Sequence, residues 1–409
     1  MLGEGMVYVL GLALRYWVVG AGAADRPEIA TPLNSWRRLT EGVHLYRAGL
    51  DPYEGVVFHE TPLALAVFSW VEGRHAHWLF LLGDLLTALL LARLGRLVAQ
   101  QRLVKQEVER RSYSKEAAPL LATISATLNA HRSMALAFLL NPYTIANCAA
   151  MTSTVWANLL LAAFLVSLAS GWRAASCAAL ALATYQSLYP ALLLLPLALS
   201  RTRTMDRRAA LREVAAILAI FAAALALLLV ISAELMGGWS FLNSTYGFIL
   251  SVPELSPNLG IFWYFFTEMF DHFRLFFVWT FQLNLVIYLA PLAIRFPDQP
   301  LLLATTLAGL TAVFKSYPGV GDVGLFLSLL PLFAHLLPFM KQTLVTGGML
   351  LAATVLAPIA WQLWIYNNSA NANYYFAINL VYSTALIFLI TDMLFAQVKP
   401  HSSRLLVDV

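Results

Sequence analysis

Side chains able to do chemistry are scarce in this sequence, and the most suggestive group lies in the aromatic stretch FWYFFTEMFDHF, Phe262–Phe273. If this stretch is helical, Glu268, Asp271 and His272 are spaced i, i+3 and i+4 and share one face. Such a face could hold a metal ion, work as an acid–base cluster or line a pocket for a lipid headgroup. The alternative is a helix end at a membrane surface, where aromatic and charged side chains meet the headgroups.

A second polar stretch, WIYNNSANANYYFAINL, covers Trp364–Leu380 and is rich in asparagine. Asparagine both donates and accepts hydrogen bonds, which suits sugar hydroxyls and phosphate oxygens, and aromatic rings can lie against sugar or acyl surface. A short polar turn between two membrane spans would explain the same residues. As ligands of a lipid headgroup we select Trp263, Glu268, Asp271, His272, Asn371, Asn373 and Tyr374.

No familiar catalytic or metal-binding motif occurs in the sequence. It contains no DxD, DD, DE, ED or EE, and no HExxH, CxxC or GxxxxGK[ST]. Cys148 and Cys177 both lie in apolar stretches without a histidine nearby, which is typical of buried free thiols and not of nucleophiles. We therefore expect no catalytic residue, no metal and no cofactor in this chain.

The composition indicates the medium in which these residues work. Of the 409 residues 60% are hydrophobic and only 12% are charged, and between Ala117 and Ser200 the formal charges are Arg132 and Arg173. A membrane-spanning helix needs about 20 mostly apolar residues, and such runs recur along the chain. The sequence therefore predicts an all-α polytopic integral membrane protein, a single transmembrane domain over 1–409 with about 10–12 spans. The net charge of +4 does not indicate nucleic-acid binding.

The distribution of basic residues predicts the topology. Lys and Arg are concentrated at 99–117 and 201–213, which we expect to be cytosolic loops. The loop at 24–59 then falls on the lumenal side, as do the glycosylation sequons at Asn243 and Asn367. The N-terminal apolar run could be a signal peptide, but Arg15 interrupts it and no basic residue precedes it, which favours an uncleaved first span.

Several apolar runs are broken by proline, as in FHETPLALAVFSW, LLNPYTI, TYQSLYPALLLLP and FKSYPGVGDVGLF. Irregular backbone at membrane depth is tolerated where it is buried in protein or lines a polar cavity, and discontinuous helices often border a substrate site. We expect broken or re-entrant helices around a polar region. An ordinary span that begins or kinks at each proline is the alternative.

Long segments of the chain resemble one known family. TPLNSWRRLTEG, DPYEGVVFHETPL, FLLNPYTI, LALATYQSLYP, YGFILSVPELSPNLGIFWYFFTEMFDHF, FKSYPGVGDV and LWIYNNSANANYYFAINL occur in order from about Glu28 to Val398. They are similar to the phosphatidylinositol-glycan class U family, the multi-spanning subunits of the GPI transamidase complex. The stretch Gly49–Leu63 also resembles the first loop of the GPI mannosyltransferases.

The resemblance implies a function and a location. It implies a non-catalytic subunit in the endoplasmic reticulum membrane that binds the GPI lipid, for attachment to a proprotein whose C-terminal signal is removed. The implied partners are a cysteine-protease-like catalytic subunit and further lumenal and membrane subunits. The implied architecture is a glycosyltransferase-C-like bundle without an acidic pair. A lipid-linked mannosyltransferase is the alternative, and the missing acidic pair argues against it.

Overall fold

The computed structural model describes residues 4–19, 26–71, 73–108 and 124–404, and within these ranges it contains helices and no β-strand. The predicted all-α polytopic fold class is confirmed. Two parts of the predicted loops, 24–25 and 109–117, lie outside the described residues. Within the first basic loop, residues 99–108 are helical, since the preceding helix runs on to Val108.

The α-helices are numbered in chain order. They are α1 (Glu4–Val18), α2 (Trp36–Arg47), α3 (Pro62–Ser69), α4 (Gly73–Val108), α5 (Ile124–Leu139), α6 (Pro142–Ala149), α7 (Thr154–Ser170), α8 (Arg173–Gln186), α9 (Leu194–Thr202), α10 (Arg207–Met236), α11 (Phe248–Ser251), α12 (Phe262–Glu268), α13 (Asp271–Ile287), α14 (Leu289–Arg295), α15 (Pro300–Phe314), α16 (Val320–Leu329), α17 (Thr343–Trp361) and α18 (Ala372–Arg404). Some of them are joined by 3₁₀-helices, at Tyr189–Leu193 and Leu330–Phe339, or by π-helical turns, at Asn243–Gly247 and Gln362–Tyr366.

Six helical stretches in the described ranges are long and apolar enough to cross a membrane, which is fewer than the predicted ten to twelve spans. Three further apolar helices are too short to cross a membrane as one continuous helix. Other apolar stretches are interrupted and fall short of that length for the same reason. The six are His75–Val108, Arg207–Met236, Asp271–Arg295, Val320–Phe339, Thr343–Tyr366 and Ala372–Val398.

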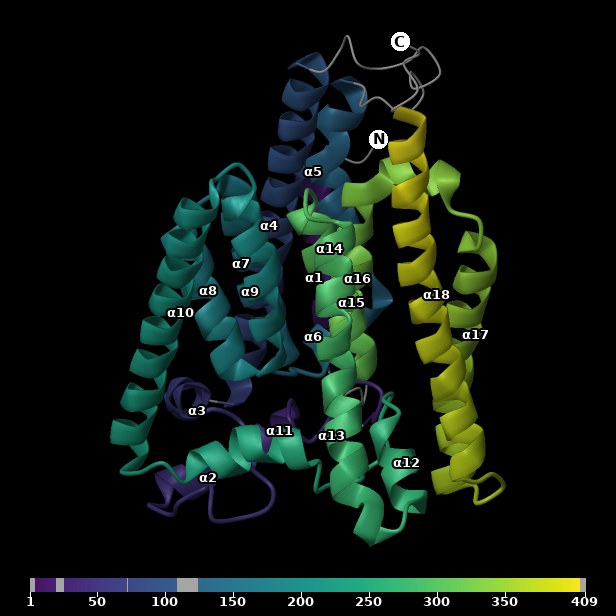
Figure 1. Cartoon of the computed structure of the whole chain (residues 1–409). Coiled ribbons are helices and arrows are strands. Elements are labelled where there is room, and N and C mark those ends of the chain that lie inside the picture. Colours follow the sequence, from purple (N-terminus) through teal and green to yellow (C-terminus); the bar gives the residue numbers. More distant parts are fainter. Residues whose placement is uncertain (1–3, 20–25, 72, 109–123, 405–409) are drawn as a thin grey trace.

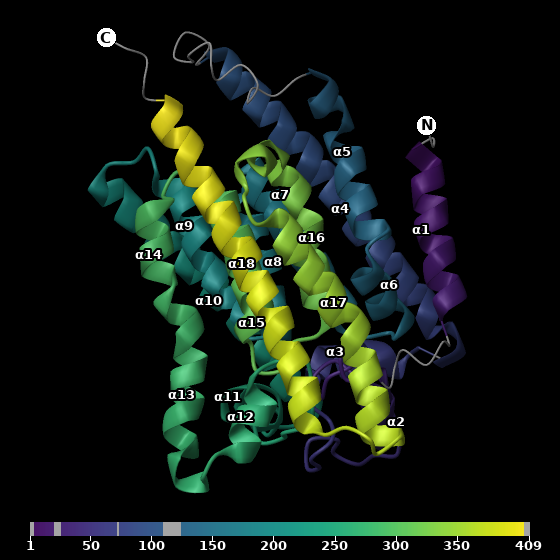
Figure 2. The same ribbon diagram turned by 90° about the vertical axis from the view of Figure 1, so that its right-hand side faces the viewer.

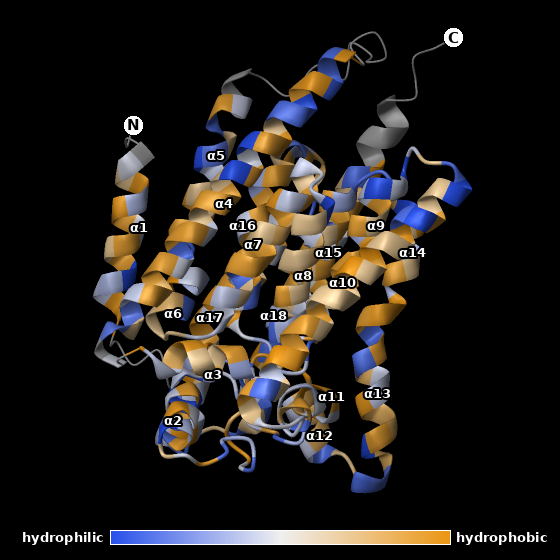
Figure 3. Ribbon diagram, turned by 90° about the vertical axis from the view of Figure 1, so that its left-hand side faces the viewer, coloured by the Kyte–Doolittle hydropathy of each residue, from blue (hydrophilic) through white to orange (hydrophobic). Residues whose placement is uncertain are grey.

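The two ends of the bundle differ in character (Figures 1 and 2). One end holds the end of α4 and the α9–α10 turn, which carry Lys and Arg of the two basic stretches, together with the start of α1 and the end of α18. We call it the basic end. The opposite end, which we call the loop end, holds α2, α3, α11, α12 and the turn between α17 and α18. Both sequon asparagines, Asn243 and Asn367, are exposed in segments of the loop end. Figure 3 shows that the helices between these two ends consist mostly of hydrophobic residues.

Three of the four proline-containing segments predicted to break helices do break them. α5 ends before Asn141 and α6 begins at Pro142, where the Asn141 side chain accepts a hydrogen bond from the Tyr143 backbone N–H at 2.9 Å. Proline lacks an N–H, and its ring clashes with the preceding helical turn, so a helix begins there more easily than it continues. The other two breaks lie at Pro190 and Pro318, whereas at Pro62 a helix begins after the first loop, as in the alternative interpretation.

Buried polar side chains hold these breaks in place. The Tyr189 hydroxyl accepts a hydrogen bond from the Ser316 backbone N–H at 2.9 Å, and Gln282 Nε2 donates to Ser316 Oγ at 2.8 Å. Asn158 Nδ2 donates to the Gly321 carbonyl at 3.1 Å. Buried backbone groups need partners, and the Tyr189 hydroxyl supplies one for the Ser316 N–H at the break before Pro318.

The first loop does not project from the bundle but is bonded to the starts of two of its helices and to the segment before α12. Asn34 Nδ2 donates to Thr154 Oγ1 at 2.9 Å, and Arg38 makes a two-pronged ion pair with Glu254 at 2.6 and 2.8 Å. The carbonyl of Glu28 accepts from the Val320 N–H at the start of α16, at 2.9 Å. The loop therefore reaches into the bundle and fixes Glu28 beside α16.

Candidate functional site

The three ionisable residues of the aromatic stretch do not share a helix face, contrary to the sequence interpretation. α12 ends at Glu268 and α13 begins at Asp271, because Met269 and Phe270 have extended backbone conformations with ψ of 144° and 135°. Glu268, Asp271 and His272 are all exposed at this turn. The i, i+3, i+4 spacing is therefore interrupted between its first and second members.

The buried face of α12 packs on the ends of α17 and α18. The Trp263 ring is 4% exposed, and its centroid lies 6.2 Å from Trp364, 6.1 Å from Tyr375 and 5.9 Å from Phe376. Offset and edge-on aromatic contacts of this kind add to the free energy of apolar burial. Trp263 is thus a packing residue that joins the two stretches selected from the sequence.

A hydrogen bond joins the same two stretches at the surface. The Tyr264 hydroxyl donates to Oδ1 of Asn373, and the Tyr264 ring stacks on Phe376 with centroids 4.3 Å apart. Asn371 Oδ1 accepts from the Asn373 backbone N–H at 3.1 Å at the start of α18. Tyr374 is 65% exposed. Asn371, Asn373 and Tyr374 therefore form the surface of a patch that α12 completes.

Polar residues that the sequence interpretation did not select lie beneath this patch. Glu28 is 6% exposed, and Tyr375 and Asn379 are fully buried one turn apart on α18. Asn379 Nδ2 donates to the Asn258 carbonyl at 2.6 Å. The Tyr375 hydroxyl lies beside the Glu28 carboxyl without reaching hydrogen-bond geometry. Three parts of the chain thus meet at this point: the first loop, the segment that precedes α12, and the helix α18.

Burial dominates the electrostatics of Glu28. Loss of water raises the pKa of its carboxyl above the ordinary value, and a backbone hydrogen bond, the Tyr375 hydroxyl and Arg26 lower it to a smaller extent. A raised carboxyl pKa means that the neutral acid is favoured relative to a carboxyl in water. The Glu28 carboxyl is therefore more readily protonated than that of an exposed glutamate, and in the neutral form it can donate as well as accept a hydrogen bond.

The described residues contain no cluster suited to a metal ion. Nowhere among them do three His, Cys, Asp or Glu side chains gather closely enough to share one. Cys148 and Cys177 are free and buried, with 1% and 0% exposure, and they lie on α6 and α8. Cys177 Sγ donates to the Ile217 carbonyl at 3.8 Å. Both thiols are therefore packed inside the bundle.

From the role that the family resemblance implies, we expect the double replacement Cys148→Ala and Cys177→Ala to leave GPI attachment nearly unchanged in cells that lack their own member of that family. Both thiols fill buried space, and alanine removes little volume at either position. The measurement is the surface level of a GPI-anchored reporter, with the amount of the variant protein determined in parallel. Lost attachment at a normal level of assembled protein would mean that a thiol takes part in the chemistry.

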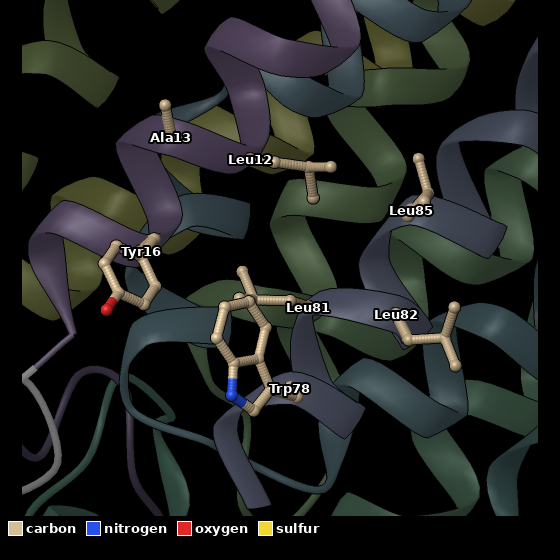
Figure 4. A pocket seen from close by; sticks show the side chains of 7 residues that line it. All are labelled: Leu12, Ala13, Tyr16, Trp78, Leu81, Leu82 and Leu85. Carbon is tan, nitrogen blue, oxygen red and sulfur yellow. The ribbon is translucent and has the colours of Figure 1, made fainter. Parts of the chain in front are cut away.

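An apolar groove of about 400 Å³ lies elsewhere, between α1 and α4 (Figure 4). Its walls are leucine and alanine side chains, with Tyr16 and Trp78 stacked at one side, their ring centroids 5.6 Å apart. It offers almost no hydrogen-bonding groups to a polar headgroup. The polar patch on α12 and α18 is therefore the better candidate for headgroup recognition.

Comparison with known proteins gives one consistent family. The family model described as GPI transamidase subunit PIG-U matches residues 8–382. The chain is 37% identical over 386 residues to the GPI-anchor transamidase component PIGU of Homo sapiens, which covers 92% of this chain and 88% of the human protein. It is 31% identical over 375 residues to the GPI transamidase component GAB1 of Saccharomyces cerevisiae, covering 91% and 87% of the two chains.

The family match includes every part of the site described above, from the first loop to the start of α18. The family match ends at residue 382, beyond the Asn371–Asn379 segment. This chain belongs to the GPI transamidase subunit PIG-U family.

Proposed function

We propose that this chain is a non-catalytic subunit of the GPI transamidase complex of the endoplasmic reticulum membrane. In this role it binds the GPI lipid, presents it for attachment to proprotein C-termini and holds partner subunits in place. The names of its relatives, which are components of that enzyme, support membership of the complex. The observation that carries the lipid-binding part is the hydrogen bond between Tyr264 and Asn373, which brings together two polar-aromatic stretches 109 residues apart.

The patch has the chemistry that a glycolipid headgroup requires. With its Oδ1 occupied by Tyr264, Asn373 keeps its amide N–H groups for phosphate or hydroxyl oxygens. The exposed ring of Tyr374 can lie against sugar or acyl surface at the membrane boundary. If the basic end is cytosolic, as the positive-inside rule predicts, the patch faces the lumen.

In this proposal the exposed turn between α12 and α13 adds charged groups to the recognition of the headgroup. Glu268 and Asp271 are carboxylates that repel phosphate, so in this proposal they accept hydrogen bonds from an ammonium group, from sugar hydroxyls or from a partner subunit. His272 can donate to a phosphate oxygen. The three residues form an exposed rim, in contrast to the buried packing of Trp263.

Catalysis is assigned in this proposal to another subunit. The lipid-linked mannosyltransferase remains the competing function because Gly49–Leu63 resembles the first loop of such enzymes. A transferase of that kind needs a carboxylate pair to bind metal or act as base, and the sequence offers none there. Transfer of sugar to a lipid acceptor by the purified chain alone would establish the competing function.

The test of lipid binding is the variant Asn373→Leu. Loss of one hydrogen bond to a charged group costs roughly 1.5–3 kcal/mol, which is on the order of tenfold to a hundredfold in affinity. We expect photocrosslinking of this chain to a photoreactive GPI analogue to fall by that factor in microsomes. The other subunits should still co-purify with the variant, because leucine fits an exposed position.

Two further variants make this result specific. Asn284→Leu makes the same chemical change on α13, in the interior of a long helix, and should leave crosslinking unchanged. Tyr264→Phe removes only the hydroxyl that orients Asn373, and a smaller loss is expected because the asparagine remains. If Asn373→Leu leaves crosslinking intact and dissolves the complex, Asn373 is an assembly residue and the site is wrong.

A further inference from the structure

Two arginines at the basic end share one carboxylate. Glu213 on α10 accepts a hydrogen bond from Nη1 of Arg173, at the start of α8, at 2.8 Å, and one from Nε of Arg201, at the end of α9, at 3.0 Å. Nη1 of Arg201 also donates to the Gly171 carbonyl, in the turn between α7 and α8, at 2.9 Å. The carboxylate therefore holds two guanidinium groups beside one another and joins the starts of α8 and α10 to the end of α9.

The two guanidinium groups keep hydrogen-bond donors for a second anion. A guanidinium has five N–H groups. Arg173 uses one of its nitrogens and Arg201 two, and within the described part of the chain their other nitrogens have no partner. The side chains of the two arginines are 40% and 31% exposed, whereas that of Glu213 is 11% exposed. The remaining donors are thus accessible, and one negative charge faces two positive charges.

This cluster lies where α10 enters the membrane. Residues 214–233 carry no charge and follow Glu213 directly, and a helix needs about that many residues to cross the hydrocarbon of a bilayer. Trp172, which precedes Arg173, is 56% exposed, and Cζ of Arg93 lies 5.5 Å from the centroid of its ring. Exposed tryptophan is typical of the headgroup region of a membrane. The cluster is therefore at the depth of the phospholipid phosphates.

Positive charge exceeds negative charge around the cluster. Residues 201–213 contain five arginines and two carboxylates. One carboxylate is Glu213, and the other, Asp206, is exposed in the turn before α10. Arg93 and Arg173 add to the positive charge. The ammonium group of a zwitterionic headgroup would meet arginines and a carboxylate that is already paired, whereas a headgroup with a phosphate and no ammonium is attracted.

We propose that Arg173 and Arg201, held by Glu213, bind the phosphate of an anionic glycerophospholipid that lacks an ammonium group. Guanidinium groups bind phosphate oxygens through paired N–H bonds. The acyl chains lie along the apolar surface of α10, which buries few of its residues. If the basic end is cytosolic, the lipid belongs to the cytosolic leaflet. This site is at the opposite end of the bundle from the α12–α18 patch and does not depend on the function proposed above.

The test is a titration of the purified full chain in neutral detergent with phosphatidylglycerol or phosphatidylcholine. Phosphatidylglycerol carries a phosphate and no ammonium group, and a lipid that binds the folded chain raises its thermal midpoint. We expect phosphatidylglycerol to bind about tenfold more tightly than phosphatidylcholine, because the arginine pair forms charge-assisted hydrogen bonds without repelling an ammonium group. Equal affinities for the two lipids would overturn the proposal.

Arg173→Gln removes one guanidinium of the pair, while Arg201 still holds Glu213. The affinity for phosphatidylglycerol should fall about tenfold, and the lipid-free midpoint should change little because the lost ion pair is partly exposed. Arg173→Lys keeps the charge and should lose about threefold, since an ammonium group cannot form the paired bonds.

Arg203→Gln is the matched control. It removes the same charge from the turn between α9 and α10, where Arg203 is paired with Asp298 and not with Glu213. It should weaken the binding of phosphatidylglycerol less than threefold. Equal losses in Arg173→Gln and Arg203→Gln would mean that the lipid responds to a diffuse basic surface, and the assigned site would be wrong.

Two soluble anions test whether the occupant is a lipid. Inorganic phosphate and a polyglutamate peptide are added in place of the lipid at the same ionic strength. Neither should raise the thermal midpoint as phosphatidylglycerol does, because neither has acyl chains that cover the apolar surface of α10. An equal rise with inorganic phosphate would identify a site for soluble phosphate, and an equal rise with polyglutamate a docking site for an acidic protein segment. Either result would overturn the lipid assignment.

Discussion

Asp84→Ala is expected to destabilise the folded chain by about 3–5 kcal/mol, because it leaves a buried guanidinium without its counter-charge. Arg15 on α1 and Asp84 on α4 form an ion pair with Nε and Oδ2 2.5 Å apart, and their side chains are 0% and 1% exposed. Neither charge can turn to water. Removing one partner leaves an uncompensated buried charge and lowers the free energy of unfolding strongly, whereas replacing both partners by apolar residues changes it little.

The remaining bonds of Arg15 explain why an arginine occupies this place in an apolar helix. Its Nη1 donates to the Leu139 carbonyl at 2.6 Å, and its Nη2 donates to the Phe138 carbonyl at 3.3 Å and to Thr144 Oγ1 at 2.9 Å. Those carbonyls end α5, where a helix carries partial negative charge and unpaired acceptors. Arg15 thereby joins α1 to α4, α5 and α6.

The measurement is the thermal midpoint and yield of the detergent-solubilised full chain. Asp298→Ala is the control, because Asp298 pairs with Arg203 at 2.7 Å while both side chains are about half exposed, so its loss should cost less than about 1 kcal/mol. The double variant Arg15→Leu and Asp84→Leu should recover much of the loss, since two apolar residues can replace a buried pair. Equal midpoints for Asp84→Ala and Asp298→Ala would contradict this account.

Local sequence patterns predicted the interruptions of the bundle well and one critical turn wrongly. Proline acts on its own neighbourhood, so the breaks at Pro142 and Pro318 follow from sequence. The break at Met269 and Phe270 contains neither glycine nor proline, and the residues around it are compatible with a continuous helix. α12 packs on the start of α18 through Trp263 and Tyr264, and no short-range pattern predicts such a long-range contact.

The burial of Glu28 beneath the candidate site could not be predicted from the sequence, for a related reason. Glu28 is one of several acidic residues in the first loop, and nothing in its local sequence sets it apart from Glu54, which is exposed. Its burial depends on Val320 and Tyr375, which are hundreds of residues away in the chain. By contrast, the polar surface at Asn373 could be selected, because asparagines between aromatic anchors are conspicuous in an apolar sequence.

The first loop contains another buried carboxyl, and its environment makes the stability of the chain depend on pH. Glu60 precedes α3, is 6% exposed, and has Oε1 without a partner. Burial raises its pKa from 4.5 to about 7, and the Ser153 hydroxyl opposes this rise only weakly. The folded state therefore binds a proton more tightly than the unfolded state does.

The sign of the effect follows from this difference in proton affinity. Because the pKa of Glu60 is raised in the folded state, its contribution to the free energy of unfolding is fully present below about pH 4.5. This contribution is lost as the pH rises to about 7. The shift corresponds to about 3 kcal/mol between those limits. The neighbouring His59 acts in the opposite direction, since burial lowers its pKa and stability is lost as the pH falls.

Glu60→Gln should remove the dependence that Glu60 causes. Glutamine resembles the neutral acid, so the variant should have nearly the stability of the wild-type chain at pH 5 and be more stable by about 3 kcal/mol at pH 8. The thermal midpoints of both chains are measured in detergent at each pH, and their difference cancels the contribution of His59. Glu54→Gln, a change of the same kind at an exposed position of the same loop, should show no such difference. A Glu60→Gln midpoint that follows the wild-type value at both pH values would mean that the Glu60 carboxyl is ionised and solvated in the folded chain.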